Sequence, residues 1–231
     1  MDYLTIYQKH ADEYDRLVNA EDCDHHLLPA IEQHVPLDAA TVLEVGAGTG
    51  RITRLLVANG AKVFGSDQSP AMLQVAKAHL AALSGSGWWL ACADGRALPV
   101  ISGWADLAIA GWVFGHQRGW NPTGWQAASK RGLDEMARAL KPGGVTIIIE
   151  TLGTGSEIPA APSAELEEYY HWLETEHGFT RESLRTDYQF LSIDEAAAVT
   201  GFFFGEEFAA RVRRESWLRV PECTGLWWKR T

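Results

Sequence analysis

The sequence predicts an α/β fold in which helices cover both faces of a mostly parallel β-sheet. Short β-rich runs alternate with segments of helical periodicity between residue 41 and residue 151. Residues 145–151 form an almost uninterrupted apolar run, as expected for a strand that is buried on both faces. A glycine-rich turn joins the first strand to its helix, which is typical of folds that bind ligands at the carboxyl ends of parallel strands.

Turn and cap residues set the bounds of the alternating elements. The predicted strands cover residues 41–45, 61–65, 88–92, 106–110 and 145–151. The predicted helices between them cover residues 52–58, 71–83 and 125–140. Ser69 and Pro70 suit the N-cap and the first position of the second helix. Residues 84–87 (Ser-Gly-Ser-Gly) predict a turn, and residues 141–144 (Lys-Pro-Gly-Gly) end the third helix.

After residue 151 the alternation becomes less regular. The predicted elements there are a loop at 153–162, a helix at 163–176, a strand at 180–191, a helix at 193–200 and a strand at 225–229. No internal repeat and no long polar linker divides the chain. We therefore expect one domain over residues 1–231, with residues 1–35 and 152–180 covering its active face.

The composition narrows the classes of function. The 231 residues include 20 basic and 30 acidic side chains, a net charge of −10, which argues against a nucleic-acid groove and against an anionic membrane surface. Cys23, Cys92 and Cys223 are scattered and lack metal-site spacing, as in reduced cytosolic proteins. The N-terminal residues show no signal-peptide pattern and no apolar run is long enough to span a membrane, so a cytoplasmic protein without a bound metal is expected.

The segment Glu44-Val45-Gly46-Ala47-Gly48-Thr49-Gly50-Arg51 carries the main functional signal. Its glycines remove side chains where a ligand must approach the backbone. Dinucleotide-binding proteins also place glycines at a strand-to-helix turn, in the pattern G-x-G-x-x-G. Here the third glycine comes one residue early, and Arg51 occupies the position where that pattern has its third glycine. A carboxylate at Glu44 would repel a pyrophosphate and would suit an ammonium or sulfonium group.

This E-x-G-x-G-x-G pattern at the end of a first strand resembles the signature of class I S-adenosylmethionine-dependent methyltransferases of the small-molecule type. The resemblance extends over nearly the whole chain, including residues 106–110 and 140–144. It implies a doubly wound, mostly parallel seven-stranded sheet, the Rossmann-like methyltransferase fold, with cover segments before the first strand and after the fifth. It also implies S-adenosyl-L-methionine as cofactor and S-adenosyl-L-homocysteine as product.

The resemblance assigns roles to particular residues. Asp67, 17 residues after Gly50, matches the acid that binds the ribose, Met72 matches a residue that packs on the adenine, and Asp94 would accept a hydrogen bond from the adenine amine. The N-terminal segment resembles a lid helix, in which Tyr14 rather than Tyr7 is expected to cover the cofactor. The cofactor-binding residues so implied are Tyr14, Glu44, Gly46, Gly48, Gly50, Arg51, Asp67, Gln68, Met72, Ala93, Asp94, Gly95, Ala110 and Gly111.

Each of these residues also has a purely structural alternative. The glycines can serve only a tight turn, Asp67 can cap the following helix, and Asp94 can form an Asp-Gly turn. Arg51 can be a solvated side chain of the first helical turn or a contact to the cofactor's carboxylate.

The acceptor site is expected after the fourth strand, where tryptophans 104, 112, 120 and 125 fall within 22 residues. Trp112 and Trp120, in a glycine-rich loop, are predicted to line a pocket for a neutral or cationic organic acceptor, together with Tyr169 of the cover helix. His116 is the candidate general base, since imidazole titrates near neutrality. A histidine hydrogen-bonded within the loop, and rings that only fill the core, are the alternatives.

We therefore expect a monomeric or homodimeric enzyme that methylates a small molecule on O, N or C. The alternatives are a nicotinamide-dependent oxidoreductase, a noncatalytic module that binds S-adenosylmethionine, and an RNA-modifying methyltransferase. The glycine spacing disfavours the oxidoreductase. The charge of −10 and the absence of an Asn/Asp-Pro-Pro-aromatic motif disfavour the RNA-modifying enzyme.

Overall fold

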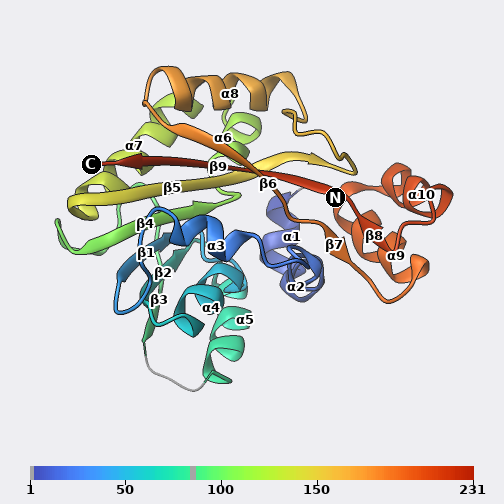
Figure 1. The fold of residues 1–231 in the computed structure, drawn as a ribbon, viewed down its shortest axis with the longest axis horizontal. Coiled ribbons are helices and arrows are strands. Elements are labelled where there is room, and N and C mark those ends of the chain that lie inside the picture. Colours follow the sequence, from blue (N-terminus) through green and yellow to red (C-terminus); the bar gives the residue numbers. More distant parts are fainter. Residues whose placement is uncertain (1–2, 84–86) are drawn as a thin grey trace.

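A seven-stranded sheet with the order β3-β2-β1-β4-β5-β9-β6 forms the centre of the molecule (Figure 1). The computed structural model describes residues 3–83 and 87–231. The strands of this sheet are β1 (Thr41–Val45), β2 (Lys62–Asp67), β3 (Trp88–Cys92), β4 (Ala105–Gly111), β5 (Leu140–Thr154), β6 (Thr180–Arg185) and β9 (Glu222–Arg230). The pairs among β1 to β5 are all parallel, and β9 runs antiparallel to both β5 and β6. The predicted doubly wound, mostly parallel fold is confirmed.

Helices pack on both faces of the sheet. They are α1 (Tyr3–Lys9), α2 (Ala11–Ala20), α3 (Leu27–Glu32), α4 (Arg51–Ala58), α5 (Pro70–Ala81), α6 (Gly115–Trp120), α7 (Trp125–Ala139), α8 (Ala164–Thr175), α9 (Ile193–Phe204) and α10 (Glu206–Arg214). In Figure 1, α3, α4 and α5 lie on one face, and α6, α7 and α8 on the other. The strand residues alternate between two apolar clusters on these faces, with Leu107 in one and Ala108 in the other. Burying both faces removes the apolar run of β5 from water, which is why that strand needs no polar face.

A smaller unit extends from one edge of the molecule (Figure 1). It contains the two-stranded ribbon of β7 (Tyr188–Gln189) and β8 (Arg219–Val220) with helices α9 and α10. Its apolar cluster includes Leu17 of α2, so the N-terminal helices pack between this unit and the sheet. None of the described helices combines the length and the apolar character needed to cross a membrane.

Capping residues explain several helix starts. The Ser69 side chain accepts a hydrogen bond from the Met72 amide, with Pro70 at the first helical position, which confirms the predicted start of α5. Ser163 and Ser192 cap α8 and α9 in the same way. The turn predicted at residues 84–87 falls largely on residues 84–86, which lie outside the described residues.

Several bounds differ from the sequence prediction. β5 begins at Leu140, because Leu140 already pairs with Ala105 of β4 before a shift in register, and it continues to Thr154. The strand predicted at 180–191 is divided into β6 and β7, since Thr186 and Asp187 between them turn the chain away from the main sheet. Helices α6 and α10 were not predicted.

Candidate active site

A cavity of about 500 Å³ opens at the carboxyl ends of β1, β2, β3 and β4. This is the edge where open α/β sheets bind ligands, and the volume is that of a small-molecule site. Of the predicted site residues, those that line it are Tyr14, Gly46, Gly48, Asp67, Gln68, Met72, Ala93, Asp94, Gly95, Gly111, Trp112, His116 and Trp120. The structure thus brings together residues that are up to 106 positions apart in the chain, from Tyr14 to Trp120.

The turn between β1 and α4 presents backbone rather than side chains to the cavity. Gly46 and Gly48 have φ angles of 74° and 55°, in the left-handed region that favours glycine. A Cβ at Gly46 would lie 2.2 Å from Cγ2 of Val113, so no larger residue fits without movement. The amides of Gly46 and Ala47 both donate to the carbonyl oxygen of Ser66, at 2.7 and 2.9 Å, which fixes the turn against β2. A ligand in the cavity can therefore approach this backbone closely.

Asp67 lies beside this turn, at the end of β2. Its Oδ2 accepts a hydrogen bond from the Gly48 amide at 2.9 Å, and its Oδ1 accepts one from the Ser69 amide at 2.8 Å. Burial raises the pKa of this carboxyl, while the backbone donors oppose the rise. Each carboxylate oxygen has a second lone pair, so these bonds leave acceptor capacity for a ligand hydroxyl.

Two predicted cofactor contacts, Glu44 and Arg51, lie outside the cavity lining. Glu44 is buried beneath the turn, where its Oε2 accepts a hydrogen bond from Oγ1 of Thr53 at 2.5 Å, and burial raises its pKa to about 8. Arg51 turns toward α2, donating to Oε2 of Glu21 at 2.6 Å, and its guanidinium lies 4.4 Å from the ring centre of Trp112. Arg51 is thus not a solvated side chain of the first helical turn, since it is mostly buried and paired with Glu21. Its contact to the cofactor's carboxylate stays a prediction.

One end of the cavity carries the predicted adenine-binding residues. Met72 of α5 and the segment Ala93-Asp94-Gly95 after β3 line this end. The Asp94 carboxylate accepts hydrogen bonds from the Arg96 guanidinium and amide, which lower the pKa of Asp94. Asp94 is thus held as an ionised acceptor at the mouth of the cavity.

The opposite end is walled by rings, and we call these residues the aromatic end. Its members are Tyr7, Trp112, Phe114, His116 and Trp120. The Tyr7 hydroxyl and Nε2 of His116 form a hydrogen bond of 2.9 Å, and the imidazole stacks on Trp120 with ring centres 5.0 Å apart. Burial lowers the pKa of His116 to about 4, so it is neutral at pH 7. This pKa lies below the near-neutral value expected from the sequence, because the imidazole is buried.

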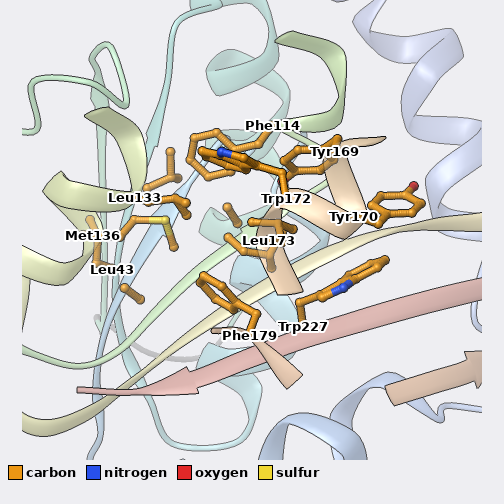
Figure 2. Packing of buried hydrophobic residues seen from close by; sticks show 14 of the residues in the cluster. Leu43, Phe114, Leu133, Met136, Tyr169, Tyr170, Trp172, Leu173, Phe179 and Trp227 are labelled. Carbon is orange, nitrogen blue, oxygen red and sulfur yellow. The ribbon is translucent and has the colours of Figure 1, made fainter. Parts of the chain in front are cut away.

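Tyr169, predicted as a pocket residue, lies in the core instead. Its side chain is fully buried, with ring centres 6.0 Å from Trp125 and 6.2 Å from Trp172 (Figure 2). The apolar face of α8 must cover the sheet, and this requirement takes its aromatic residues away from the cavity. Gly50 and Ala110 also lie outside the lining: Gly50 caps α4, and Ala110 is buried within β4.

The sequence analysis missed some lining residues, among them Gln8 and Gln117, and ranked Tyr7 below Tyr14. The carbonyl oxygen of Tyr7 accepts a hydrogen bond from Oγ of Ser69 at 2.7 Å, which attaches α1 to the start of α5. A helical interpretation of residues 115–120 would have grouped His116 with Trp120, four residues apart, on one face. The glycines at 115 and 119 concealed that signal.

Buried carboxyls surround the site without lining it. Glu44, Glu150 and Glu222, here called the three buried carboxyls, each have a pKa raised to about 8 by burial. Glu150, at the end of β5, accepts a hydrogen bond from the Gly115 amide at 2.8 Å and so supports the start of α6. Glu44 and Glu222 instead accept hydrogen bonds from the threonine hydroxyls of Thr53 and Thr151.

Comparison with known proteins agrees with this geometry. Residues 43–148 match the family model described as a methyltransferase domain. The chain is 37% identical over 109 residues to demethylmenaquinone methyltransferase of Tropheryma whipplei, covering 47% of this chain and 41% of that protein. It is 33% identical over 142 residues to the biotin biosynthesis bifunctional protein BioHC of Cellvibrio japonicus, covering 61% of this chain and 24% of that protein. The chain thus spans less than half the length of these curated relatives.

A solved structure shares the fold over almost the whole chain. The S-adenosylmethionine-dependent methyltransferase of Aquifex aeolicus superposes with a TM-score of 0.55 at 14% identity, covering 98% of this chain and 92% of that one. The family model matches the segment that runs from within β1 to within β5 and includes the glycine turn and Asp67. Residues 43–148 therefore resemble a methyltransferase domain in sequence, and the chain as a whole shares the fold of a solved S-adenosylmethionine-dependent methyltransferase.

Proposed function

We propose that this protein transfers the methyl group of S-adenosyl-L-methionine to a small organic acceptor by in-line displacement. The observation that carries the proposal is the shared cavity. The glycine turn and Asp67 face the same space as the aromatic end, so a cofactor and an acceptor can meet there. The charge of −10 supports a small molecule rather than RNA as the acceptor.

The residues present fit the cofactor. Gly46 and Gly48 leave backbone where a side chain would fill the cradle, Asp67 keeps lone pairs for ribose hydroxyls, and Met72 and Asp94 stand where an adenine would lie. When bound, the cofactor supplies an electrophilic methyl group on a sulfonium. Because that leaving group needs no acid, catalysis by the protein consists mainly of alignment and exclusion of water.

The aromatic end would orient the acceptor and receive its proton. Tyr14 lies above the glycine turn, with a ring carbon 3.9 Å from the position of a Cβ on Gly48, and so covers the cofactor side. If the acceptor atom is a hydroxyl, its proton would pass to the imidazole of His116, which is neutral at pH 7. The low pKa of His116 makes it a weak base.

Calorimetry with S-adenosylmethionine and variants of one acid tests the cofactor assignment. Asp67→Ala should raise the dissociation constant roughly ten- to a hundredfold, because it removes charge-assisted hydrogen bonds worth on the order of 1.5–3 kcal/mol. Asp38→Ala, which removes an exposed carboxylate distant from the cavity lining, should leave affinity unchanged. Equal affinity of all three proteins would refute the assignment.

Transfer itself is measured with a methyl-labelled cofactor and a pool of small acceptors. Label appearing in an acceptor supports the enzyme, and its loss in His116→Ala with unchanged cofactor affinity supports the role of His116. Tight cofactor binding without transfer to any acceptor would favour a noncatalytic module. Tighter binding of a nicotinamide dinucleotide would favour the oxidoreductase.

A further inference from the structure

The charged side chains of the cavity lie at its cofactor end. Within residues 3–83 and 87–231, the charged lining residues are Asp67, Asp94 and Arg96, at the ends of β2 and β3. Asp94 and Arg96 already form a bidentate pair. The aromatic end contributes rings, and its polar lining includes the amides of Gln8 and Gln117.

Charged side chains near the aromatic end are paired with other residues of the protein and do not line the cavity. The Arg51 guanidinium is paired with Glu21, and Arg118 pairs with Glu168 at 2.8 Å on the outer side of α6. The carboxyl of Glu150 is buried and accepts the Gly115 amide. A carboxylate or ammonium group on an acceptor would thus be desolvated without an ionic partner, which is costly.

The rings are also not arranged as a cage for a cation. Such a cage needs several free ring faces around one point. One face of Trp112 is occupied by the Arg51 guanidinium, which would repel a cation, and one face of Trp120 is covered by His116. The Tyr7 ring stands edge-on to its neighbours, at 85° to Tyr14 and 79° to Trp120. This arrangement suits a flat, uncharged body that lies against ring edges and faces.

We propose that the aromatic end selects an uncharged planar acceptor, of the hydroxyarene class, and excludes acidic and amine-bearing analogues of the same ring. The inference rests on the proposed function and names its acceptor class. The hydrogen-bonded pair of Tyr7 and His116 supplies the polar atoms that orient the acceptor hydroxyl. In the transfer, the C–S bond of the sulfonium breaks, the acceptor O–C bond forms, and the hydroxyl proton passes to the neutral imidazole of His116.

A matched set of probes tests this selectivity. Calorimetry on the protein saturated with S-adenosylhomocysteine compares 2-naphthol with its 6-carboxylate and 6-aminomethyl derivatives at pH 7. We expect 2-naphthol to bind at least about tenfold more tightly than either charged derivative. Equal or tighter binding of a charged derivative overturns the proposal, as does binding of none of the three.

The same titrations separate this inference from the proposed function. Failure of S-adenosylhomocysteine to bind refutes the cofactor assignment. Titrations of the three probes without the product then still decide the preference of the cavity, with the same outcomes supporting or overturning the inference.

Two tryptophans provide a variant and its control. Trp120 and Trp89 are both exposed, at 41% and 50%, but only Trp120 lines the cavity. Trp120→Ala should weaken 2-naphthol binding at least about fivefold, because it removes stacking area, while Trp89→Ala should not. Equal effects of the two substitutions would place the probe elsewhere and overturn the proposal.

A charge introduced at the aromatic end should change the ranking. Gln117→Glu adds a carboxylate to the lining, so the aminomethyl probe should gain at least about tenfold relative to 2-naphthol. An unchanged ranking in a folded variant would show that the uncharged wall does not set the selectivity, and would overturn the proposal.

Discussion

Arg51→Met removes the positive charge that faces Glu21 while keeping an apolar stem beside Trp112. In the protein the two side chains are joined at 2.6 Å, and both are mostly buried. Burial raises the pKa of Glu21, and the charge of Arg51 opposes that rise. Without Arg51, the carboxylate has lost its cation and becomes neutral by binding a proton.

The cost of that proton can be worked out from the ordinary pKa of 4.5. Holding a carboxyl protonated costs about 1.36 kcal/mol for each pH unit above its ordinary pKa. The largest destabilisation that a protonated Glu21 can cause is therefore about 4.1 kcal/mol at pH 7.5 and about 1.4 kcal/mol at pH 5.5. Since the folded variant holds a proton that the unfolded chain releases, its stability relative to the parent should fall as pH rises, by up to about 2.7 kcal/mol over this range.

Urea unfolding of the parent and the variant at the two pH values measures this difference. Arg54→Met is the matched control, because Arg54 lies on the same helix and donates to the neutral amide of Asn19. In the double variant Arg51→Met with Glu21→Gln, the destabilisation relative to the parent should no longer depend on pH. A destabilisation of equal size at pH 5.5 and 7.5 would refute the reasoning. If Arg51→Met keeps the stability of the parent but binds the cofactor at least tenfold more weakly, Arg51 would be a cofactor-binding residue.

Other changes test the turn, the buried carboxyls, the base and the lid. Gly46→Ala should lower the free energy of unfolding by about 2 kcal/mol or more, because its Cβ meets Val113 at 2.2 Å; adding Val113→Ala should recover part of the loss in urea unfolding. The three buried carboxyls hold protons that the unfolded chain releases above pH 4.5. The free energy of unfolding should therefore fall by at least about 1 kcal/mol per pH unit from pH 6 to 8. Glu150→Gln should make this fall with pH smaller. If His116 is the base, the rate should rise with pH near 4 and be flat above about pH 6, and a midpoint near 6.5 would contradict its burial. Hydrogen exchange in α1 and α2 should slow when cofactor is added, and equal exchange in both states would argue against a lid.

The sheet and its ligand-binding edge were predictable because their signals are local. An apolar run such as that of β5 has few alternatives to a strand buried on both faces, and the glycine turn before α4 requires positive φ angles that few residues adopt. The N-cap at Ser69 likewise depends on neighbouring residues alone. These features were correct in the sequence prediction.

Side-chain partners from distant segments were not predictable in the same way. Arg51 pairs with Glu21, 30 residues earlier, and nothing in the local pattern distinguishes that partner from a ligand carboxylate. The rings of Tyr169 and Trp172 were ambiguous, since either a core or a pocket accepts aromatic residues at helical spacing. The pKa of His116 depends on α1 closing over it, which the sequence around residue 116 does not encode.

The position of β9 has a consequence for how the chain is made. Strand β9, residues 222–230, lies between β5 and β6, both of which are synthesised earlier. Until β9 has emerged from the ribosome, β5 presents an open edge with the apolar residues Ile147, Ile148 and Ile149, and β6 has no partner in the sheet. Nascent chains arrested before residue 222 should therefore bind chaperones that recognise apolar strands, and release should coincide with the emergence of the nine residues of β9 from the ribosome.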